Sequence, residues 1–353
     1  MSSKRIFFLD DMRVIACFMV IMVHACEFYF IDGSDIGIRN RYDGFWVSVI
    51  DSAFRCSVPL FVMISAYLLV PVKGSSTDFF RRRLTRVAIP FALWSVLYAV
   101  LPLLWGGQQV ADMQAALLRL THNFNDASGH LWFVYMLAGL YLVMPVISPW
   151  LEKVSRRGEE GFLGLWFLSS FFPYLRDGLG DIFGECYWNE YHTLWYFSGF
   201  IGYVVLAHYL RHHVTGSARR QALAGTLFYL CGYVFTATFW YGRISTAETL
   251  QQLELSWRFC TPNVILMSAG AFLVIRALFS RRRQECRPVK QVSMLSYGIY
   301  LMHIFVLNAI HGLLAPLFST PVVIVATGVA TFLICCVLAK ALSLLPGSRC
   351  LIG

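Results

Sequence analysis

The segment DDMRVIACFMVIMVHACE, residues 10–27, decides the fold, because it places several ionisable side chains along a long apolar run. A helix needs about 20 mostly apolar residues to cross a bilayer, and ionisable groups inside such a helix are costly enough to indicate function. The segment resembles a secretory signal only superficially, since it contains Arg13, His24 and Glu27 and has no clean small-residue cleavage site. It therefore predicts a retained transmembrane helix over residues 12–31.

The composition of the whole chain also points to lipid. Of 353 residues, 58% are hydrophobic and 14% are charged, and the mean hydropathy is +0.60. Soluble domains are about half apolar and a quarter charged. We predict an all-α, polytopic membrane protein of about ten transmembrane helices, folded as a single membrane-embedded domain over residues 1–353. The expected spans are 12–31, 51–71, 87–105, 130–149, 161–175, 192–210, 221–240, 258–279, 292–314 and 320–345.

The net charge of +9 would suggest nucleic-acid binding in a soluble protein. Here the Lys and Arg residues lie in short loops between apolar runs, where they report orientation, and we expect no nucleic-acid partner. With ten spans, 22 of the 29 Lys and Arg residues, Lys4 and Arg5 among them, fall on the side of the N-terminus. This bias predicts that both termini are cytoplasmic and that residues 32–50 form an outer loop.

The ten cysteines give no sign of a metal site or of a disulfide framework. They show no CxxC pattern and no ligand spacing with histidine, and we expect no bound metal. Most of them lie in or near apolar runs, where cysteine behaves as a small buried hydrophobe.

The first helix carries the most informative polar pattern. Arg13 and His24 are 11 residues apart, almost three helical turns, so they share one face about 16 Å apart along the axis. Asp10 lies three residues before Arg13 and Glu27 three after His24, which extends the stripe. In one interpretation, Arg13 snorkels to headgroups and His24 is a hydrogen-bonded core residue. In the other, a polar track that begins with a bidentate Asp10–Arg13 pair leads to an acid/base histidine within the bilayer.

Other candidates lie at the ends of later spans. Arg55 is either an interfacial anchor or a contact to an acceptor sugar or lipid phosphate, and Pro59 favours a kink nearby. The run Arg81, Arg82, Arg83 and Arg86 reports orientation and also suits phosphate groups, as does Arg281 to Arg283 to a lesser degree. We expect substrate contacts from His130, Trp132, Tyr300 and His303, each of which has a structural alternative.

Taken in order, these pieces resemble the acyltransferase 3 family of membrane-bound acyltransferases. The signature Arg13-x10-His24 matches, as do SVPLFVMISAYLL at 57–69, FFRRRLTRVAIPF at 79–91, HLWF at 130–133 and SYGIYLMHI at 296–304. The first two helices are most similar to surface-polysaccharide O-acetyltransferases, including the type that acts on enterobacterial common antigen. Ala66 departs from the glycine that many relatives have, which puts helix packing there in doubt.

The resemblance implies transfer of an acyl group, most often acetyl, from cytoplasmic acyl-CoA to a hydroxyl of a cell-surface or lipid-linked glycan. Acetyl-CoA would be a co-substrate, with no permanently bound cofactor. His24 would be catalytic, as general base or as acyl carrier, and Glu27 would orient it. Arg13 and Asp10, with the Arg81 to Arg86 cluster, would hold the donor. The bacterial inner membrane and a role in polysaccharide or lipopolysaccharide biosynthesis follow from the same resemblance.

Two other classes of function stay open at this point. A glycan exporter or flippase of the same fold would need a substrate-sized passage and no acyl-CoA. A structural or regulatory membrane component would have lost its activity, which Arg13 and His24 argue against.

Overall fold

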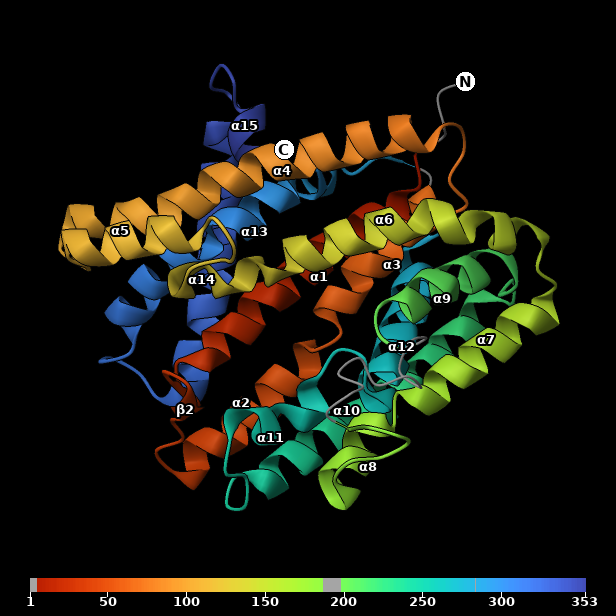
Figure 1. The fold of residues 1–353 in the computed structure, drawn as a ribbon, viewed down its shortest axis with the longest axis horizontal. Helices are drawn as coiled ribbons and strands as arrows, with labels where there is room; N and C mark the ends of the chain where they lie inside the picture. Colours follow the sequence, from red (N-terminus) through yellow and green to blue (C-terminus); the bar gives the residue numbers. More distant parts are fainter. Residues whose placement is uncertain (1–4, 187–197, 283) are drawn as a thin grey trace.

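Helix α1 (Phe7–Glu27) runs through the interior of the protein in a computed structural model that describes residues 5–186, 198–282 and 284–353 (Figure 1). Thirteen of its residues are buried, and it packs against α2, α3, α12, α13 and α14. The close approach of α14 is possible because Gly328 faces Met22 of α1, where a Cβ atom would overlap the methionine sulfur. The helix with the polar stripe is thus held from several sides.

The protein is 76% helical, as the sequence predicted, with one two-stranded hairpin in the described residues. The described elements after α1 are β1 (Ile31–Asp32), β2 (Asp35–Ile36), α2 (Arg41–Phe54), α3 (Ser57–Leu69), α4 (Ser76–Val100), η1 (Leu101–Trp105), α5 (Val110–Arg119), η2 (Asp126–Leu131), α6 (Trp132–Lys153), α7 (Arg156–Ser169), α8 (Phe172–Leu179), α9 (Ile201–His212), α10 (Ala218–Arg243), α11 (Leu250–Leu253), η4 (Glu254–Trp257), α12 (Pro262–Phe279), α13 (Arg287–Leu314), α14 (Thr320–Leu342) and α15 (Arg349–Ile352).

Seven helical segments of the described chain are long and apolar enough to cross a membrane. They are Arg41–Leu69, Ser76–Trp105, Ala127–Lys153, Ala218–Arg243, Leu250–Phe279, Arg287–Leu314 and Thr320–Leu342. The other expected spans correspond to α1, which is interrupted by charge, and to α7 and α9, which have 14 and 12 residues. The expected span 192–210 begins outside the described residues. Lys4 and Arg283 also lie outside them. The number ten stays a prediction.

The expectation of a loop over residues 32–50 is wrong, because α2 begins at Arg41. The Asn40 side chain caps this helix by accepting a hydrogen bond from the Asp43 amide at 2.9 Å. Helix α2 leads into α3 through a turn at Arg55 and Cys56. Pro59 lies in the first turn of α3, where proline removes no helical hydrogen bond, so the chain bends just before the expected kink.

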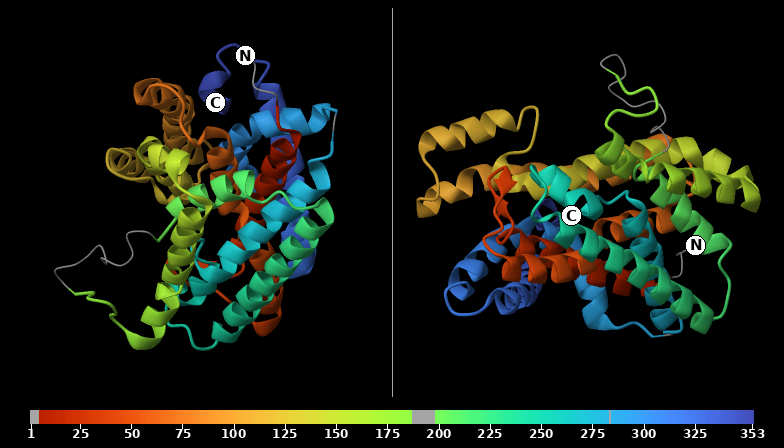
Figure 2. Two further views of the ribbon diagram at one scale, coloured as in Figure 1. Left: turned by 90° about the vertical axis from the view of Figure 1, so that its right-hand side faces the viewer. Right: turned by 90° about the horizontal axis from the view of Figure 1, so that it is seen from below.

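Close helix packing fixes the rest of the bundle. Helices α10 and α12 make the most extensive contact, at Gly225 and Gly270, whose missing side chains let the two backbones approach. Helix α15 lies at the same end of the molecule as the start of α1 (Figures 1 and 2). The segment after α12 also reaches this end, because Arg282 forms an ion pair with Asp11 of α1 at 2.8 Å.

Candidate active site

A cavity of about 1020 Å³ follows the polar stripe of α1. Its walls come from α1, α3, α4, α6 and α13, with the Leu250 and Glu254 region closing one side. This cavity is lined by all four residues of the stripe, Asp10, Arg13, His24 and Glu27. They share one face of α1, as their spacing predicted, and that face is turned toward the cavity. The two ends of the cavity differ in charge. We call them the basic end, lined by Arg5, Asp10, Arg13, Arg83, Arg86 and Arg211, and the Glu27 end, lined by Glu27, Arg55 and Glu254.

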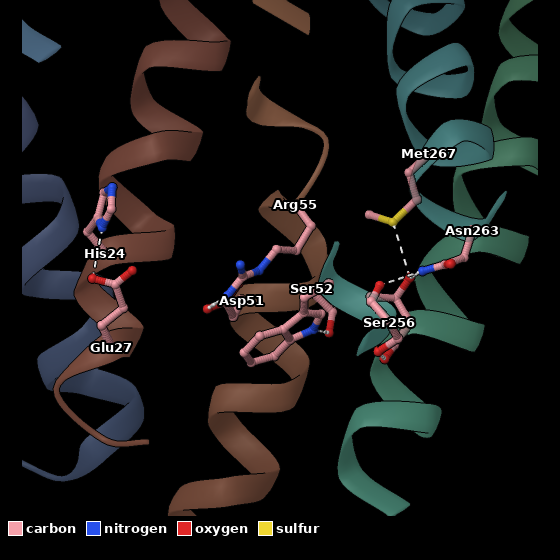
Figure 3. Close-up of polar contacts among 10 residues, drawn as sticks. His24, Glu27, Asp51, Ser52, Arg55, Ser256, Asn263 and Met267 are labelled. Carbon is pink, nitrogen blue, oxygen red and sulfur yellow. Dashed lines mark hydrogen bonds and ion pairs between the residues drawn. The ribbon is translucent and has the colours of Figure 1, made fainter. Parts of the chain in front are cut away.

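His24 lies between the two ends and is held by Glu27. Its Nδ1 atom is 2.8 Å from Oε2 of Glu27, one turn later on α1, and the exposed fractions of the two side chains are 16% and 35% (Figure 3). With Nδ1 donating to the carboxylate, Nε2 is left as the acceptor nitrogen. Nε2 points away from Glu27, back along α1 (Figure 3). This arrangement resembles the carboxylate–imidazole half of a hydrolase triad, in which the acid fixes the tautomer of the base.

Two further histidines surround His24. The ring centroid of His303 lies 5.1 Å from that of His24, and the centroid of His130 lies 6.2 Å away. His130 lines the cavity, whereas His303 is fully buried behind His24 and does not reach the cavity. Tyr300 lines the cavity and donates a hydrogen bond to the backbone oxygen of His130 at 2.5 Å. Of these three predicted substrate contacts, His130 and Tyr300 line the cavity, whereas His303 packs against His24 behind it.

At the basic end, Asp10 pairs with Arg5 and not with Arg13. The Arg5 guanidinium donates two hydrogen bonds to the Asp10 carboxylate at 2.7 and 3.0 Å. This hydrogen bond raises the pKa of Arg5, which precedes the first helix. Arg13 instead donates to Oγ of Ser293 at 3.2 Å, and Ser293 donates to Asp10 at 2.7 Å. The expected bidentate Asp10–Arg13 pair is therefore replaced by a bridge through Ser293, which sequence reasoning missed. Arg13 keeps donors free to face the cavity.

The arginine run at the start of α4 divides into two pairs. Arg83 and Arg86 line the cavity near Arg13, whereas Arg81 and Arg82 are exposed and do not line it. Arg82 donates to the backbone oxygen of Asp78 within its own helix at 3.1 Å. Of the four predicted phosphate ligands, the structure therefore brings two to the site.

At the Glu27 end, Arg55 is buried and held by two partners. It forms a two-pronged ion pair with Asp51 (Figure 3). Its guanidinium carbon lies 4.1 Å from the centroid of the Trp257 ring. The Trp257 indole in turn donates to Oγ of Ser52 at 2.8 Å. This burial contradicts the interpretation of Arg55 as an interfacial anchor. It leaves the guanidinium lining the cavity, where it can contact a substrate.

Glu254 lines this end and Asp51 supports it through Arg55, and sequence reasoning assigned neither residue to the site. Glu254 begins the short helix η4, which a buried network holds in place. The Asn263 amide donates to the backbone oxygen of Ser256 at 2.6 Å and to Oγ1 of Thr236 at 2.7 Å (Figure 3). Trp132 completes the wall by stacking on Phe259, with ring centroids 5.5 Å apart.

The fold and the site together define an integral membrane protein with a charged intramembrane cavity centred on a carboxylate-bound histidine. Residues 6–340 match the family described as an acyltransferase domain, acyltransferase 3, and the chain belongs to this family. The comparison with curated proteins found no match, and neither did the comparison with solved structures.

Proposed function

We propose that the protein is a membrane-bound O-acyltransferase that moves an acetyl group from cytoplasmic acetyl-CoA to a hydroxyl of a cell-surface or lipid-linked glycan. One observation carries the proposal. A single cavity holds an arginine cluster at one end, His24 in between, and an aromatic and carboxylate wall at the other end. An anionic donor and a hydroxyl-rich acceptor can therefore approach the same histidine from opposite sides. Membership of an acyltransferase family supports the reaction class.

In this proposal the basic end opens to the cytoplasm of a bacterial cell and the Glu27 end opens to the other side of the inner membrane. The positive-inside bias of the loops supports this orientation. A fluorescent protein fused after Gly353 tests it, because the fusion matures only when the C-terminus is cytoplasmic. If the membrane protein is folded but the fused fluorescent protein is not fluorescent, the assignment of the two ends is reversed.

Arg13, Arg83 and Arg86 would bind the phosphates of the donor. Guanidinium groups match phosphate geometry with paired hydrogen bonds, and these are about twice as strong when both partners are charged. The three side chains face one end of one cavity, and Arg13 is already oriented by Ser293. The thioester of the bound donor would then extend toward Nε2 of His24.

His24 would act as a general base. Nε2 takes the proton of the acceptor hydroxyl while its oxygen attacks the thioester carbonyl carbon. The C–O bond forms, the C–S bond breaks, and the imidazolium returns its proton to the CoA thiolate. Glu27 stabilises the positive charge on the ring while the proton resides there.

A relay through the histidine is the second form of the mechanism. Nε2 first attacks the thioester carbonyl, giving an acyl-imidazole and CoA thiolate, and the acceptor hydroxyl then takes the acyl group from the ring. In this form Glu27 receives the Nδ1 proton as the ring becomes cationic and returns it when the bond between the acyl carbon and Nε2 breaks. The proton of the acceptor hydroxyl passes through solvent to the CoA thiolate. CoA leaves before the acceptor reacts, so burst release of CoA without acceptor distinguishes the relay from direct attack.

The experiment that tests the function measures release of the CoA thiol by purified protein in nanodiscs. Acetyl-CoA is supplied with and without a crude lipid-linked glycan extract, to wild type and to His24→Ala. Release that the extract stimulates and that His24→Ala abolishes is expected. No release by folded wild type with any acyl-CoA would overturn the acyltransferase.

A glycan exporter is the second candidate, favoured by the length of the cavity from its basic end to its Glu27 end. Such a protein would translocate glycan in liposomes without acetyl-CoA. His24→Ala would then leave translocation unchanged, which separates it from the enzyme.

A further inference from the structure

A second cavity of about 420 Å³ adjoins the Glu27 end. Four residues line both cavities, namely Arg55, Trp132, Glu254 and Phe259. We call the smaller cavity the side chamber. Its volume is in the range of about 300–1,000 Å³ that small-molecule sites occupy. The side chamber has no part in the chemistry at His24, so it needs its own explanation.

The walls of the side chamber combine flat aromatic rings with a few polar groups. Trp132, Phe200 and Phe259 form one cluster, with centroids 5.5 to 6.2 Å apart. Gln251, Glu254 and Arg258 supply donors and acceptors around them. A sugar ring has apolar C–H faces and hydroxyls at its edge, so such a wall suits it, with the ring lying on an aromatic face.

Arg55 forms a rigid partition between the two cavities. Its ion pair with Asp51 and its contact with Trp257 leave it little freedom, and the Asn263 network holds the neighbouring helix η4. A fixed guanidinium donates hydrogen bonds to hydroxyls on either side without losing conformational entropy on binding. A chain of sugars that passes Arg55 would therefore accept hydrogen bonds from this guanidinium in both cavities.

We infer that the acceptor is an oligosaccharide of at least two sugar units, with the acylated unit beside His24 and its neighbour in the side chamber. This inference rests on the proposed function and adds the size of its substrate. Binding energy from the unit in the side chamber helps to hold the reacting hydroxyl near Nε2. A free monosaccharide would forgo that energy and would react poorly.

The test uses the glycan extract that supports CoA release, cut by mild acid into one-, two- and three-sugar fragments. For wild type, kcat/KM should rise by about tenfold from one sugar to two, the effect of one contact worth about 1.4 kcal/mol, and should change little from two to three. Gln251→Ala and Arg258→Ala change exposed residues that line only the side chamber. These variants should lower kcat/KM for the two-sugar fragment and leave the one-sugar value unchanged.

Gln291→Ala is the matched control, since Gln291 is exposed on α13 and lines neither cavity. Equal kcat/KM for one- and two-sugar fragments, or equal losses for both fragments in the side-chamber variants, would overturn the inference while the acyltransferase stands. Absence of CoA release with every fragment and with the intact extract would overturn both.

Discussion

The Nδ1 atom of His24 lies 2.8 Å from Oε2 of Glu27, so the imidazole that faces the cavity has a carboxylate bound to its rear nitrogen. The pair is set by the helix itself, because residues three apart on a helix are neighbours. It therefore needs no other element to form, and it leaves Nε2 free of the carboxylate.

Glu27→Gln is expected to lower kcat by about 10²-fold, because the amide keeps a hydrogen bond but loses the charge that stabilises an imidazolium. The measurement is steady-state release of CoA from acetyl-CoA. Asp35→Asn, which neutralises an exposed acid in the nearby hairpin, should leave kcat unchanged. Unchanged turnover in Glu27→Gln would remove Glu27 from the mechanism.

The arginines of α4 offer an internal comparison. Arg83→Ala and Arg86→Ala should each raise the KM for acetyl-CoA by about tenfold or more, since a hydrogen bond to a charged group contributes about 1.5–3 kcal/mol. Arg81→Ala and Arg82→Ala remove the same charge from exposed positions outside the cavity and should have little effect. Equal increases in KM for all four substitutions would mean that binding of acetyl-CoA depends on the net charge of the segment and not on Arg83 and Arg86 in particular.

The buried Asp51–Arg55 pair predicts an asymmetric effect on stability. Asp51→Ala leaves a guanidinium unpaired in the interior, which should cost about 3–5 kcal/mol, seen as a lower midpoint of thermal unfolding in detergent. The double variant Asp51→Leu with Arg55→Met removes both charges and should recover most of the loss. A double variant as unstable as Asp51→Ala would show that the packing, not the charge, is what matters.

Gly225→Ala tests the contact between α10 and α12. A Cβ atom there would lie 2.7 Å from the backbone oxygen of Gly270 and 2.9 Å from Cβ of Leu273, so the helices must separate. The expected loss is about 1–3 kcal/mol in detergent unfolding. Gly242→Ala, in the same helix with no atom within 4 Å, should be neutral or stabilising by up to about 1 kcal/mol. Similar losses in both variants would contradict the close packing.

The stripe on α1 could be predicted from the sequence because it depends only on helical periodicity. Periodicity does not make the same distinction among the arginines of α4, because both Arg82 and Arg83 are close enough to Arg86 along the helix to share a face with it. Only the packing around the cavity separates Arg83 and Arg86 from Arg82. The hydrogen bond from Ser293 could not be predicted in this way, because Ser293 lies 283 residues from its partner Asp10. A serine in an apolar helix carries no mark of the partner that folding brings to it.

The Glu27 end was harder to predict for a different reason. Helix α2 contains Asp43 and Ser48 among its apolar residues, so its first part looks like a loop when hydropathy is the guide. Asp51 and Glu254 acquire meaning only when α2 and η4 meet around Trp257. The rigid position of Arg55 depends on that tertiary contact and could not be read from its own segment.

Because one helix carries Arg13, His24 and Glu27, the number of residues between Arg13 and His24 matters as much as the types of those residues. One residue inserted between Arg13 and His24 would rotate the earlier part of α1 by about 100° relative to the later part. Arg13 would then turn away from the cavity while His24 still faced it, although every side chain would be retained. The intervening residues thus act as a rotational spacer, in which individual apolar side chains are exchangeable and their number is not.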